Sequence, residues 1–370
     1  APITSPNALK DACRLAGVDS PPSSNEDDPK LLRWKNKHPT QAAWVEAMTR
    51  YRKANKAEKQ FRGLILRTRP DARVSTRLKY CGAPHTGRWS GAGGINFQAI
   101  PRAEVAGTSM KKCLAAPAGK VLVTADLSQI EPRILHWLAG DLEFLSLVGG
   151  GIVLYEAHGR ASGLYKEDEP MKDFAPEMRH LCKARTLGLG YGCGAKRFVQ
   201  VAHALTGGAL NLSFAAARNA VIEYRRQNPL VLKLWDQLEE ALRFFIQRDE
   251  DVGEILTPNG KPIKYFDLSE KDGDLVAAVT KGDKTKRLFG GLLVENLVQA
   301  TAREIFADAL LRLEAMGLPV CLHVHDSVTV EVAESEGDAA LSALVQVLSE
   351  PPAWAKGLPL AAEGEIKGHY

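Results

Sequence analysis

VLVTADLSQIEPR, residues 121–133, is an apolar run that ends in an acid and passes at once into a polar sequence able to start a helix. Val121 to Val123 predict a buried strand, and Asp126 follows where that strand ends. Because an unpaired carboxylate is too costly to bury, we expect Asp126 to face a cleft. Asp126 is therefore a candidate metal ligand.

A second acid of this kind lies in VCLHVHDSVTVEV, residues 320–332. Two β-rich runs flank Asp326, which predicts that it lies at the bend of an antiparallel hairpin. Two aspartates on neighbouring strand ends could hold a pair of divalent cations, an arrangement used for in-line displacement at phosphorus. For either acid alone, a capping or turn role remains the alternative.

Composition describes an ordinary globular chain of two or three subdomains, with 370 residues of which 45% are hydrophobic and 25% charged. The net charge of +4 is small but unevenly distributed. Residues 50–79 carry eleven Lys and Arg against two acids, whereas residues 331–370 carry seven acids against two lysines. This split predicts one face for a polyanion; the alternative is a solvated, basic helix face.

The six cysteines form no CxxC pair, and the sequence contains neither a signal peptide nor a long apolar segment. We therefore expect reduced thiols and no structural zinc. We also expect a soluble, cytoplasmic protein without a membrane partner.

A glycine-rich stretch, TGRWSGAGGINFQAIPR, covers residues 86–102. Its backbone could approach a ligand closely, and Arg88, Asn96, Gln98 and Arg102 supply donors for phosphates or minor-groove acceptors. The alternative is that this stretch is only a set of turns.

Ser128 and Glu131 have the spacing of a capping box, in which Glu131 would serve only to start a helix. Pro132 disturbs that arrangement, because proline is comfortable only in the first helical turn. We therefore expect the helix to start at Ile130 or Glu131, which would leave the Glu131 side chain free to face the cleft.

A further helix is predicted to start at Pro176 and to carry Arg179, Lys183 and Leu187 along one face, with Tyr191 continuing the row. Cations followed by an apolar and an aromatic group suit a nucleoside triphosphate, since charge meets its phosphates and a flat surface meets its base. The same spacing also occurs in ordinary amphipathic helices.

Elsewhere the pattern predicts a helical arm over residues 31–69, basic on its outer side, and long helices over residues 211–248. Residues 252–289 predict short strands in a hairpin excursion. Residues 290–316 predict one helix, with Gln299 on its polar side.

These motifs together resemble the polymerase portion of the family A DNA polymerases, the DNA polymerase I type, and in detail its phage-encoded branch. The resemblance covers about residues 75–335. It rests on five ordered blocks: TGRWSG with NFQAIPR, DLSQIEPR, RHLCKARTLGLGYG, ENLVQATARE and HVHDSV.

The resemblance implies that Asp126 and Asp326, with the backbone carbonyl of Leu127, hold two Mg²⁺ ions. It implies that Glu131 crowds a ribose 2′-hydroxyl. It further implies that Arg179 and Lys183 contact the triphosphate and that Lys183 protonates the leaving pyrophosphate. The nucleotide-binding set also includes Gln129, Leu187 and Tyr191, and the DNA-binding set comprises Arg88, Asn96, Gln98, Arg133, Gln299 and His325.

Three residues depart from the family pattern. Leu127 replaces a tyrosine beside the first aspartate, which would alter packing under the sugar. Leu187 replaces an aromatic residue on which the nucleotide rests, and Ser327 replaces an acid that is not an essential ligand in the family.

The implied fold is an α/β (α+β) right-hand polymerase fold with an antiparallel-sheet palm, helical fingers and a reduced thumb. Its expected parts are a thumb remnant or basic arm at 1–75, palm at 76–145 and 290–370, and fingers at 146–289. No stretch resembles a 3′–5′ exonuclease, so proofreading is not expected.

The expected activity is DNA-directed DNA polymerase (nucleotidyltransferase) activity in a monomer. The expected partners are primer–template DNA and dNTPs, with a separate exonuclease or processivity factor as further candidates. One alternative is a single-subunit RNA polymerase, against which Glu131 and its SQIE context argue. Another alternative is a non-catalytic DNA-binding protein descended from a polymerase. The short length and Ser327 favour this alternative, whereas the intact aspartate pair argues against it.

Overall fold

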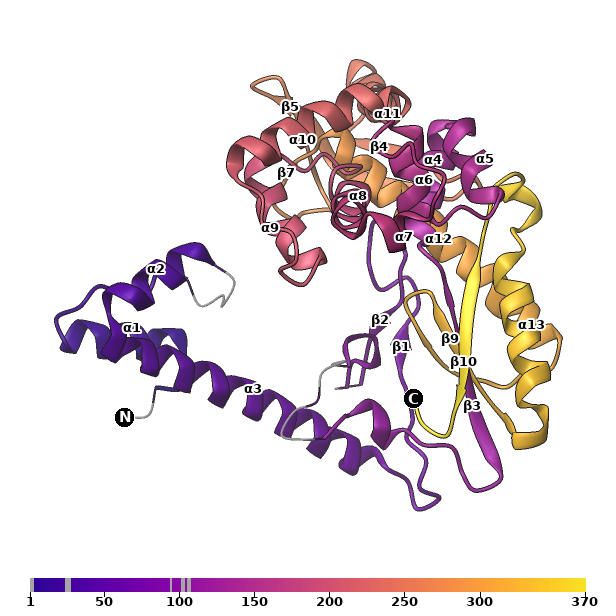
Figure 1. The fold of residues 1–370 in the computed structure, drawn as a ribbon, viewed down its shortest axis with the longest axis horizontal. Helices are drawn as coiled ribbons and strands as arrows, with labels where there is room; N and C mark the ends of the chain where they lie inside the picture. The colour runs from indigo at the N-terminus through magenta and orange to yellow at the C-terminus, as the bar shows by residue number, and fades with distance from the viewer. Residues whose placement is uncertain (1–2, 24–27, 94, 101–103, 105–107) are drawn as a thin grey trace. The chain divides into compact units, whose positions relative to one another are not determined.

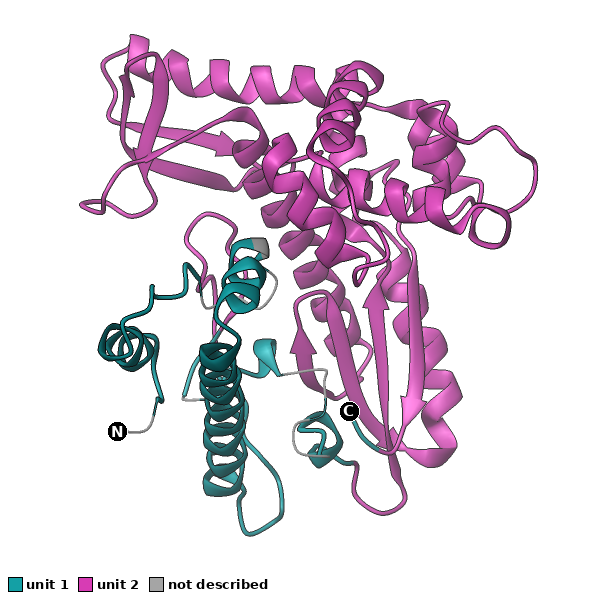
Figure 2. Ribbon diagram, turned by 60° about the vertical axis from the view of Figure 1, so that its left-hand side comes forward, with its two compact units in different colours: residues 1–77, 91–115, 369–370 teal, residues 78–90, 116–368 magenta. Residues whose placement is uncertain are grey.

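The computed structural model in Figure 1 describes residues 3–23, 28–93, 95–100, 104 and 108–370. The chain divides into two compact units, which Figure 2 colours separately. Unit 1 comprises Ala1–Arg77, Gly91–Ala115 and His369–Tyr370, and unit 2 comprises Leu78–Ser90 and Ala116–Gly368. Each unit has an apolar core of its own.

Unit 1 is mainly helical over its described residues. Each of its α-helices begins with a proline in the first turn, where the missing N–H has no helical partner to lose. The elements are α1 (Pro6–Leu15), α2 (Pro29–Lys37), α3 (Pro39–Arg67), η1 (Phe97–Ala99) and η2 (Lys111–Cys113). The helical arm predicted over residues 31–69 is thus confirmed as α2 and α3, whereas α1 was not predicted.

A small apolar core holds these helices together. It contains Leu9 and Cys13 of α1, Leu31 and Trp34 of α2, and Val45 with Met48 of α3. Most basic side chains of α3 are exposed, as the charge pattern predicted.

The sheet that carries both aspartates lies in unit 2 and is antiparallel throughout, with strand order β10-β3-β9-β8. Its strands are β3 (Lys120–Leu127), β8 (Val320–Val324), β9 (Ser327–Ala333) and β10 (Ala362–Lys367). Helix α13 (Gly337–Ser349) packs against β3 and β10. In Figure 1, α13 runs along one face of the sheet.

A run of consecutive helices in unit 2 lies between residues 130 and 247. They are α4 (Ile130–Ala139), α5 (Leu142–Gly149), α6 (Leu154–Ala161), α7 (Met171–Phe174), α8 (Pro176–Gly188), α9 (Ala195–Leu205), α10 (Phe214–Gln227) and α11 (Pro229–Gln247). The helix starts predicted at Pro176 and at Ile130 or Glu131 are confirmed, and so are the long helices predicted over residues 211–248.

A second antiparallel sheet and a long helix complete unit 2. The sheet has the order β4-β5-β6-β7, from β4 (Val252–Leu256), β5 (Pro262–Lys271), β6 (Asp274–Ala278) and β7 (Lys286–Arg287). The long helix is α12 (Gly290–Ala315), one residue shorter than predicted. The other elements are β1 (Leu78–Lys79), β2 (Ser90–Gly91), η3 (Glu334–Glu336) and η4 (Ala353–Ala355).

Two glycines allow α12 to approach its neighbours closely. A side chain at Gly290 would collide with Trp235 of α11, and one at Gly291 would collide with the backbone of Tyr191, just after α8. The start of α12 therefore fixes the position of Tyr191.

No helix in the described part of the chain combines the length and the apolar character needed to cross a membrane. All six cysteines are among the described residues, and no disulfide joins any of them.

Candidate functional site

Asp126 and Asp326 come together at one end of the β10-β3-β9-β8 sheet. Asp126 pairs with Ser327 in the β3–β9 ladder, directly after Asp326 in the chain. The backbone N–H of Leu127 donates to the carbonyl oxygen of Asp326 over 3.2 Å. Two segments predicted separately from the sequence therefore meet at adjacent strand ends.

The two-residue period of the strands decides which way Asp126 points. Val123, Ala125 and Leu127 belong to the core that also contains α12 and residues of α13, so they face these helices. Thr124 and Asp126 alternate with them and face the opposite side, where Asp126 is exposed. The sheet thus presents Asp126 on the face turned away from α12 and α13.

Glu363 is a third acid on this face that sequence reasoning missed. It is exposed on β10 and pairs directly with Asp126, so the two side chains share a face. No local pattern predicts this neighbour, because it depends on strand order alone.

Asp326 and His325 form the bend of the hairpin between β8 and β9, as predicted. His325 is exposed and has a φ of 57°, which is uncommon for a residue other than glycine. Burial raises the pKa of the Asp326 carboxyl. Its own backbone N–H and the charges of His325 and Arg88 oppose the rise, and Glu131 adds to it.

The donor chemistry at this strand end fits a hard divalent cation. Carboxylate and carbonyl oxygens are the ligands that Mg²⁺ prefers, and Mg²⁺ usually keeps several waters or substrate oxygens as well. Among the described residues, no group of three or more histidine, cysteine or acidic side chains is arranged to hold a metal. An ion here would rely on the two aspartates, with the backbone carbonyl of Leu127 and ligands from outside the chain such as water or substrate oxygens.

Glu131 forms an ion pair with Arg88, and both side chains are about one-third exposed (29% and 34%). The helix cap is Gln129, in a left-handed conformation with a φ of 53° and without a side-chain cap bond. Ser128 therefore does not form the capping box that was the alternative for Glu131. The Glu131 carboxylate instead joins the loop that carries Arg88.

Tyr191, Glu295 and Gln299 extend this cluster. The Tyr191 hydroxyl is buried and has no hydrogen-bond partner among the described residues, and burial raises its pKa well above the ordinary value, with the charge of Glu131 adding to the effect. Burial also raises the pKa of Glu295, to which Gln299 donates over 3.3 Å. Glu295 was missed by sequence reasoning, although it lies one turn before Gln299 on α12.

Arg179, Lys183 and Leu187 lie along one half-buried face of α8, as their spacing predicted. The Arg179 guanidinium lies 5.5 Å from the ring centre of Tyr155. Within the described residues, neither cation forms an ion pair with a carboxylate. Leu187 packs against the core formed by α5, α6 and α8, so it has a structural role besides its predicted contact with a nucleotide.

The opposite face of α8 carries a buried polar network around Arg185, which is 0% exposed. Its Nε donates to His158 Nε2 over 3.3 Å, and a second nitrogen donates to Gln227. A further nitrogen lies 3.5 Å from Glu223. This network connects α8 to α6 and α10 from behind the face predicted to bind a nucleotide.

Arg133 is buried against the backbone of its own unit. It is 7% exposed, and its guanidinium donates to the carbonyl oxygens of Ser128 and Pro359, each over 2.8 Å. These contacts give Arg133 a structural role, and the DNA-binding role expected from the sequence stays a prediction.

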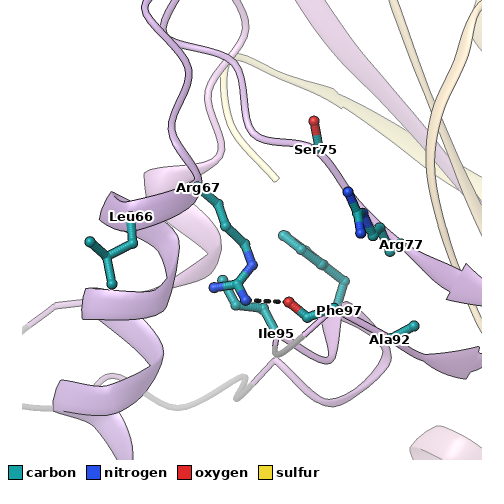
Figure 3. A pocket seen from close by; sticks show the side chains of 8 residues that line it. Leu66, Arg67, Ser75, Arg77, Ala92, Ile95 and Phe97 are labelled. Atoms are coloured by element: carbon teal, nitrogen blue, oxygen red, sulfur yellow. Dashed lines mark hydrogen bonds between the residues drawn. The ribbon is translucent and has the colours of Figure 1, made fainter.

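Asn96 and Gln98 belong to unit 1, where the Asn96 side chain accepts from the Gln98 backbone N–H over 3.0 Å. Beside them lies a pocket of about 470 Å³ whose lining includes Arg67 and Arg77 (Figure 3). Arg67 is held by the carbonyl oxygens of Gly63 and Gly93. Arg102, also predicted to contact DNA, lies outside the described residues.

Comparison with known proteins gives matches over nearly the whole chain. A family model described as DNA polymerase family A matches residues 20–369. The DNA polymerase of Bacillus phage SP02 is 27% identical over 354 residues, covering 81% of this chain and 53% of that protein. The thermostable DNA polymerase I of Thermus filiformis is 26% identical over 325 residues, covering 86% and 35% respectively.

A similar fold occurs in the POL domain of Pol1 from M. smegmatis, solved in complex with DNA primer-template and dNTP. The TM-score is 0.71 at 21% sequence identity, covering 100% of this chain and 61% of that one. The chain spans about half the length of the phage protein and about a third of the Thermus protein.

Proposed function

Because the chain belongs to DNA polymerase family A, with a match over residues 20–369, we propose that it is a template-directed DNA polymerase. It adds deoxynucleotides to the 3′-hydroxyl of a primer. The observation that carries the proposal is the meeting of Asp126 and Asp326 at adjacent strand ends, tied by the hydrogen bond from Leu127 to Asp326. Phosphoryl transfer needs mainly positioning and charge stabilisation, which such a carboxylate pair is suited to organise.

Asp126, Asp326 and the backbone carbonyl of Leu127 are the residues that would hold two Mg²⁺ ions. When bound, such ions would activate the primer hydroxyl and neutralise charge on the transferring phosphate. The exposure of Asp126 on the face turned away from α12 and α13 supports this role, because a substrate can reach an exposed side chain.

Arg179 and Lys183 bind the triphosphate of the incoming nucleotide, and Lys183 supplies the proton to the leaving pyrophosphate. Their common face on α8 and their lack of carboxylate partners within the described residues support this assignment. Leu187, Gln129 and Tyr191 complete the nucleotide site in this proposal.

Glu131 selects the sugar by occupying the space that a ribose 2′-hydroxyl would need. Its ion pair with Arg88 supports this role, because a fixed side chain excludes better than a mobile one. The nearby Tyr191 ring restricts the same space, because Gly291 packs closely on the Tyr191 backbone and fixes the position of the residue.

Primer–template DNA is contacted by Arg88, Gln299 and His325 of unit 2. Asn96 and Gln98 of unit 1, taken by itself, are further DNA-contacting residues in this proposal. The exposed basic face of α3 contributes sequence-independent attraction to phosphates. The pocket beside Asn96 suits a single phosphate, because Arg67 and Arg77 in its lining can attract a phosphate by charge.

The wider organisation is part of the proposal. Residues 1–75 act as a reduced thumb, 146–289 as fingers, and the two flanking segments, 76–145 and 290–370, as palm. The protein works as a monomer in a bacterial or phage-infected cytoplasm, since the relatives named above come from a phage and a bacterium. A separate exonuclease or processivity factor remains a candidate partner.

A primer-extension assay of the full chain tests this function. Each dNTP and each NTP is supplied singly with Mg²⁺ on primed templates that differ in the next templating base. The expected result is addition of the complementary dNTP only. Addition of NTPs alone would instead identify an RNA polymerase, and template binding without incorporation would identify a non-catalytic DNA-binding protein. Asp126→Asn protein prepared in parallel controls for contaminating polymerases.

A further inference from the structure

The loop of residues 80–90, which carries Arg88, is held against one face of α12 at two points. At the first point, Asn296 donates to His85 over 3.3 Å, and the His85 ring lies 4.7 Å from the ring of Tyr265. The second point is Arg303, seven residues further along α12. Positions seven apart lie two turns apart on the same helix face, so both contacts use one side of α12.

Arg303 lies over two aromatic rings of this loop, Tyr80 and Trp89, which contact each other edge-on with 6.2 Å between their centres. Its guanidinium carbon lies 4.6 Å from the ring centre of Tyr80 and 4.7 Å from that of Trp89. A terminal nitrogen donates to Cys81 Sγ over 3.4 Å. Arg303 therefore contacts three residues of the loop from a position that is only 5% exposed.

Trp89 connects this aromatic pair to the sheet. Its ring contacts Phe306 of α12 in an edge-on geometry, 6.1 Å between centres, and His323 of β8 at 4.9 Å. Trp89 is thus held by two residues of α12, Arg303 and Phe306, and by His323 of β8. Since Arg88 precedes Trp89 directly, its backbone is held there as well.

Gly87, on the other side of Arg88, also lies over the Arg303 side chain. A Cβ atom there would lie 4.0 Å from Arg303 Cδ and Nε and 3.7 Å from Cys81 Sγ. Its φ of +61° allows the sharp bend that returns the loop toward Trp89. Both neighbours of Arg88 therefore rest against one buried side chain.

Burial of a cation such as Arg303 is unfavourable, and its Nε has no hydrogen-bond partner among the described residues. The planar guanidinium is suited to contact two ring faces at once while donating to a third group, a geometry that the point charge of a lysine does not reproduce. A methionine would fill a similar volume without the charge, so Arg303→Met removes the cation while keeping most of the packing.

We propose that Arg303 is a positioning residue that fixes the loop of residues 80–90 and thereby directs Arg88 toward Glu131. This inference rests on the proposed polymerase function for its kinetic consequence. Arg303 touches neither DNA nor nucleotide in this role. It sets how well Arg88 is placed before a substrate arrives.

The test compares Arg303→Met, Arg303→Lys, Arg88→Ala and the Arg303→Met/Arg88→Ala double variant with the wild-type chain. Arg303→Met is expected to lower kcat/KM for dNTP incorporation about tenfold, on the scale of the two cation–π contacts it removes. Arg303→Lys is expected to recover only part of this loss. The double variant should match Arg88→Ala alone, because Arg303 acts through Arg88; multiplied losses in the double variant would overturn the proposal.

A second readout does not depend on polymerase activity. Labelling of the exposed Cys81 thiol by iodoacetamide, measured by mass spectrometry, should be faster in Arg303→Met and unchanged in Arg312→Met, a matched variant further along α12. Equal labelling of wild type and Arg303→Met would overturn the proposal. If the wild-type chain does not extend primers, the proposed function fails, while the labelling result still decides whether Arg303 holds the loop. Should Arg303→Met not fold, Arg303→Lys and Trp89→Leu provide the same comparison.

Discussion

The backbone N–H of Leu127 donates a 3.2 Å hydrogen bond to the carbonyl oxygen of Asp326. This bond continues the β3–β9 ladder past the pair Asp126 and Ser327, so both aspartates lie at the same sheet end. The register matters as much as the proximity. If β3 slipped by one residue against its neighbours, Asp126 would turn toward α13, and an apolar residue of β3 would take its place on the other face of the sheet.

Asp126→Asn and Asp326→Asn each test the catalytic assignment. Both changes keep side-chain size and remove a charged oxygen ligand, so primer extension should fall at least about 1,000-fold. Binding of primer–template DNA, measured by fluorescence anisotropy, should change far less. Single-turnover extension rates give the measurement.

Asp272→Asn serves as the matched control for these variants. Asp272 lies in the turn between β5 and β6, with a φ of 52° that asparagine also tolerates. The primer-extension rate of Asp272→Asn should equal that of the wild type. A normal rate for Asp126→Asn would remove that residue from the chemistry.

Glu131→Ala tests the selection of the sugar. Removing the side chain opens the space proposed to exclude a 2′-hydroxyl, so the ratio of kcat/KM for a dNTP to that for the matching NTP should fall about tenfold or more. Glu131→Gln keeps the bulk and loses the charge, and it should retain most of the discrimination. If the dNTP-to-NTP ratio of kcat/KM in Glu131→Ala equals that of the wild type, Glu131 does not select the sugar and serves only to pair with Arg88.

Arg133→Met distinguishes a structural role from a DNA-binding role. The change leaves the carbonyl oxygens of Ser128 and Pro359 without their donor, which should lower the free energy of unfolding by about 2 to 4 kcal/mol. If Arg133 serves the fold alone, affinity for primer–template DNA, measured well below the unfolding temperature, should stay within about twofold of the wild type. Stable protein with weakened DNA binding would support the DNA-binding role predicted from the sequence.

The local sequence pattern was sufficient to predict those features that depend only on residues close together in the chain. The alternation around Asp326 predicted its hairpin, Pro176 predicted the start of α8, and Pro132 predicted that the helix after Asp126 starts too late for Ser128 to cap it. Each of these depends on backbone preferences that act within a few residues.

Long-range partners could not be predicted in this way. Arg133 binds the carbonyl oxygen of Pro359, 226 residues away in sequence, and Glu363 meets Asp126 only through the strand order. Arg303 was expected on the polar side of its helix, one turn from Gln299, and its burial was not predicted, because a basic residue on a helix usually indicates an exposed position. Its burial depends on aromatic rings supplied by a loop more than 200 residues earlier in the chain.

His158 predicts how stability depends on pH. It is 1% exposed, and burial lowers the pKa of its imidazole well below the ordinary value of 6.5, with Arg185 and His136 adding to the effect. Because Arg185 donates to Nε2, the folded state needs a neutral ring. The unfolded chain accepts a proton below pH 6.5, whereas the folded chain does not. The free energy of unfolding should therefore fall as pH decreases from 6.5, by at most about 1.4 kcal/mol per pH unit from this group.

His158→Gln and His158→Phe remove that proton-binding difference. Both variants should be less stable than the wild type at pH 7.5. The difference in free energy of unfolding should narrow as the pH falls below 6.5, because only the wild type then loses stability by keeping this ring neutral in the folded state. Urea unfolding at pH 7.5, 6.5 and 5.5 provides the measurement. A gap that stays constant across this range would mean that the histidine is protonated in the folded protein, and the network around Arg185 would then need a different arrangement of donors.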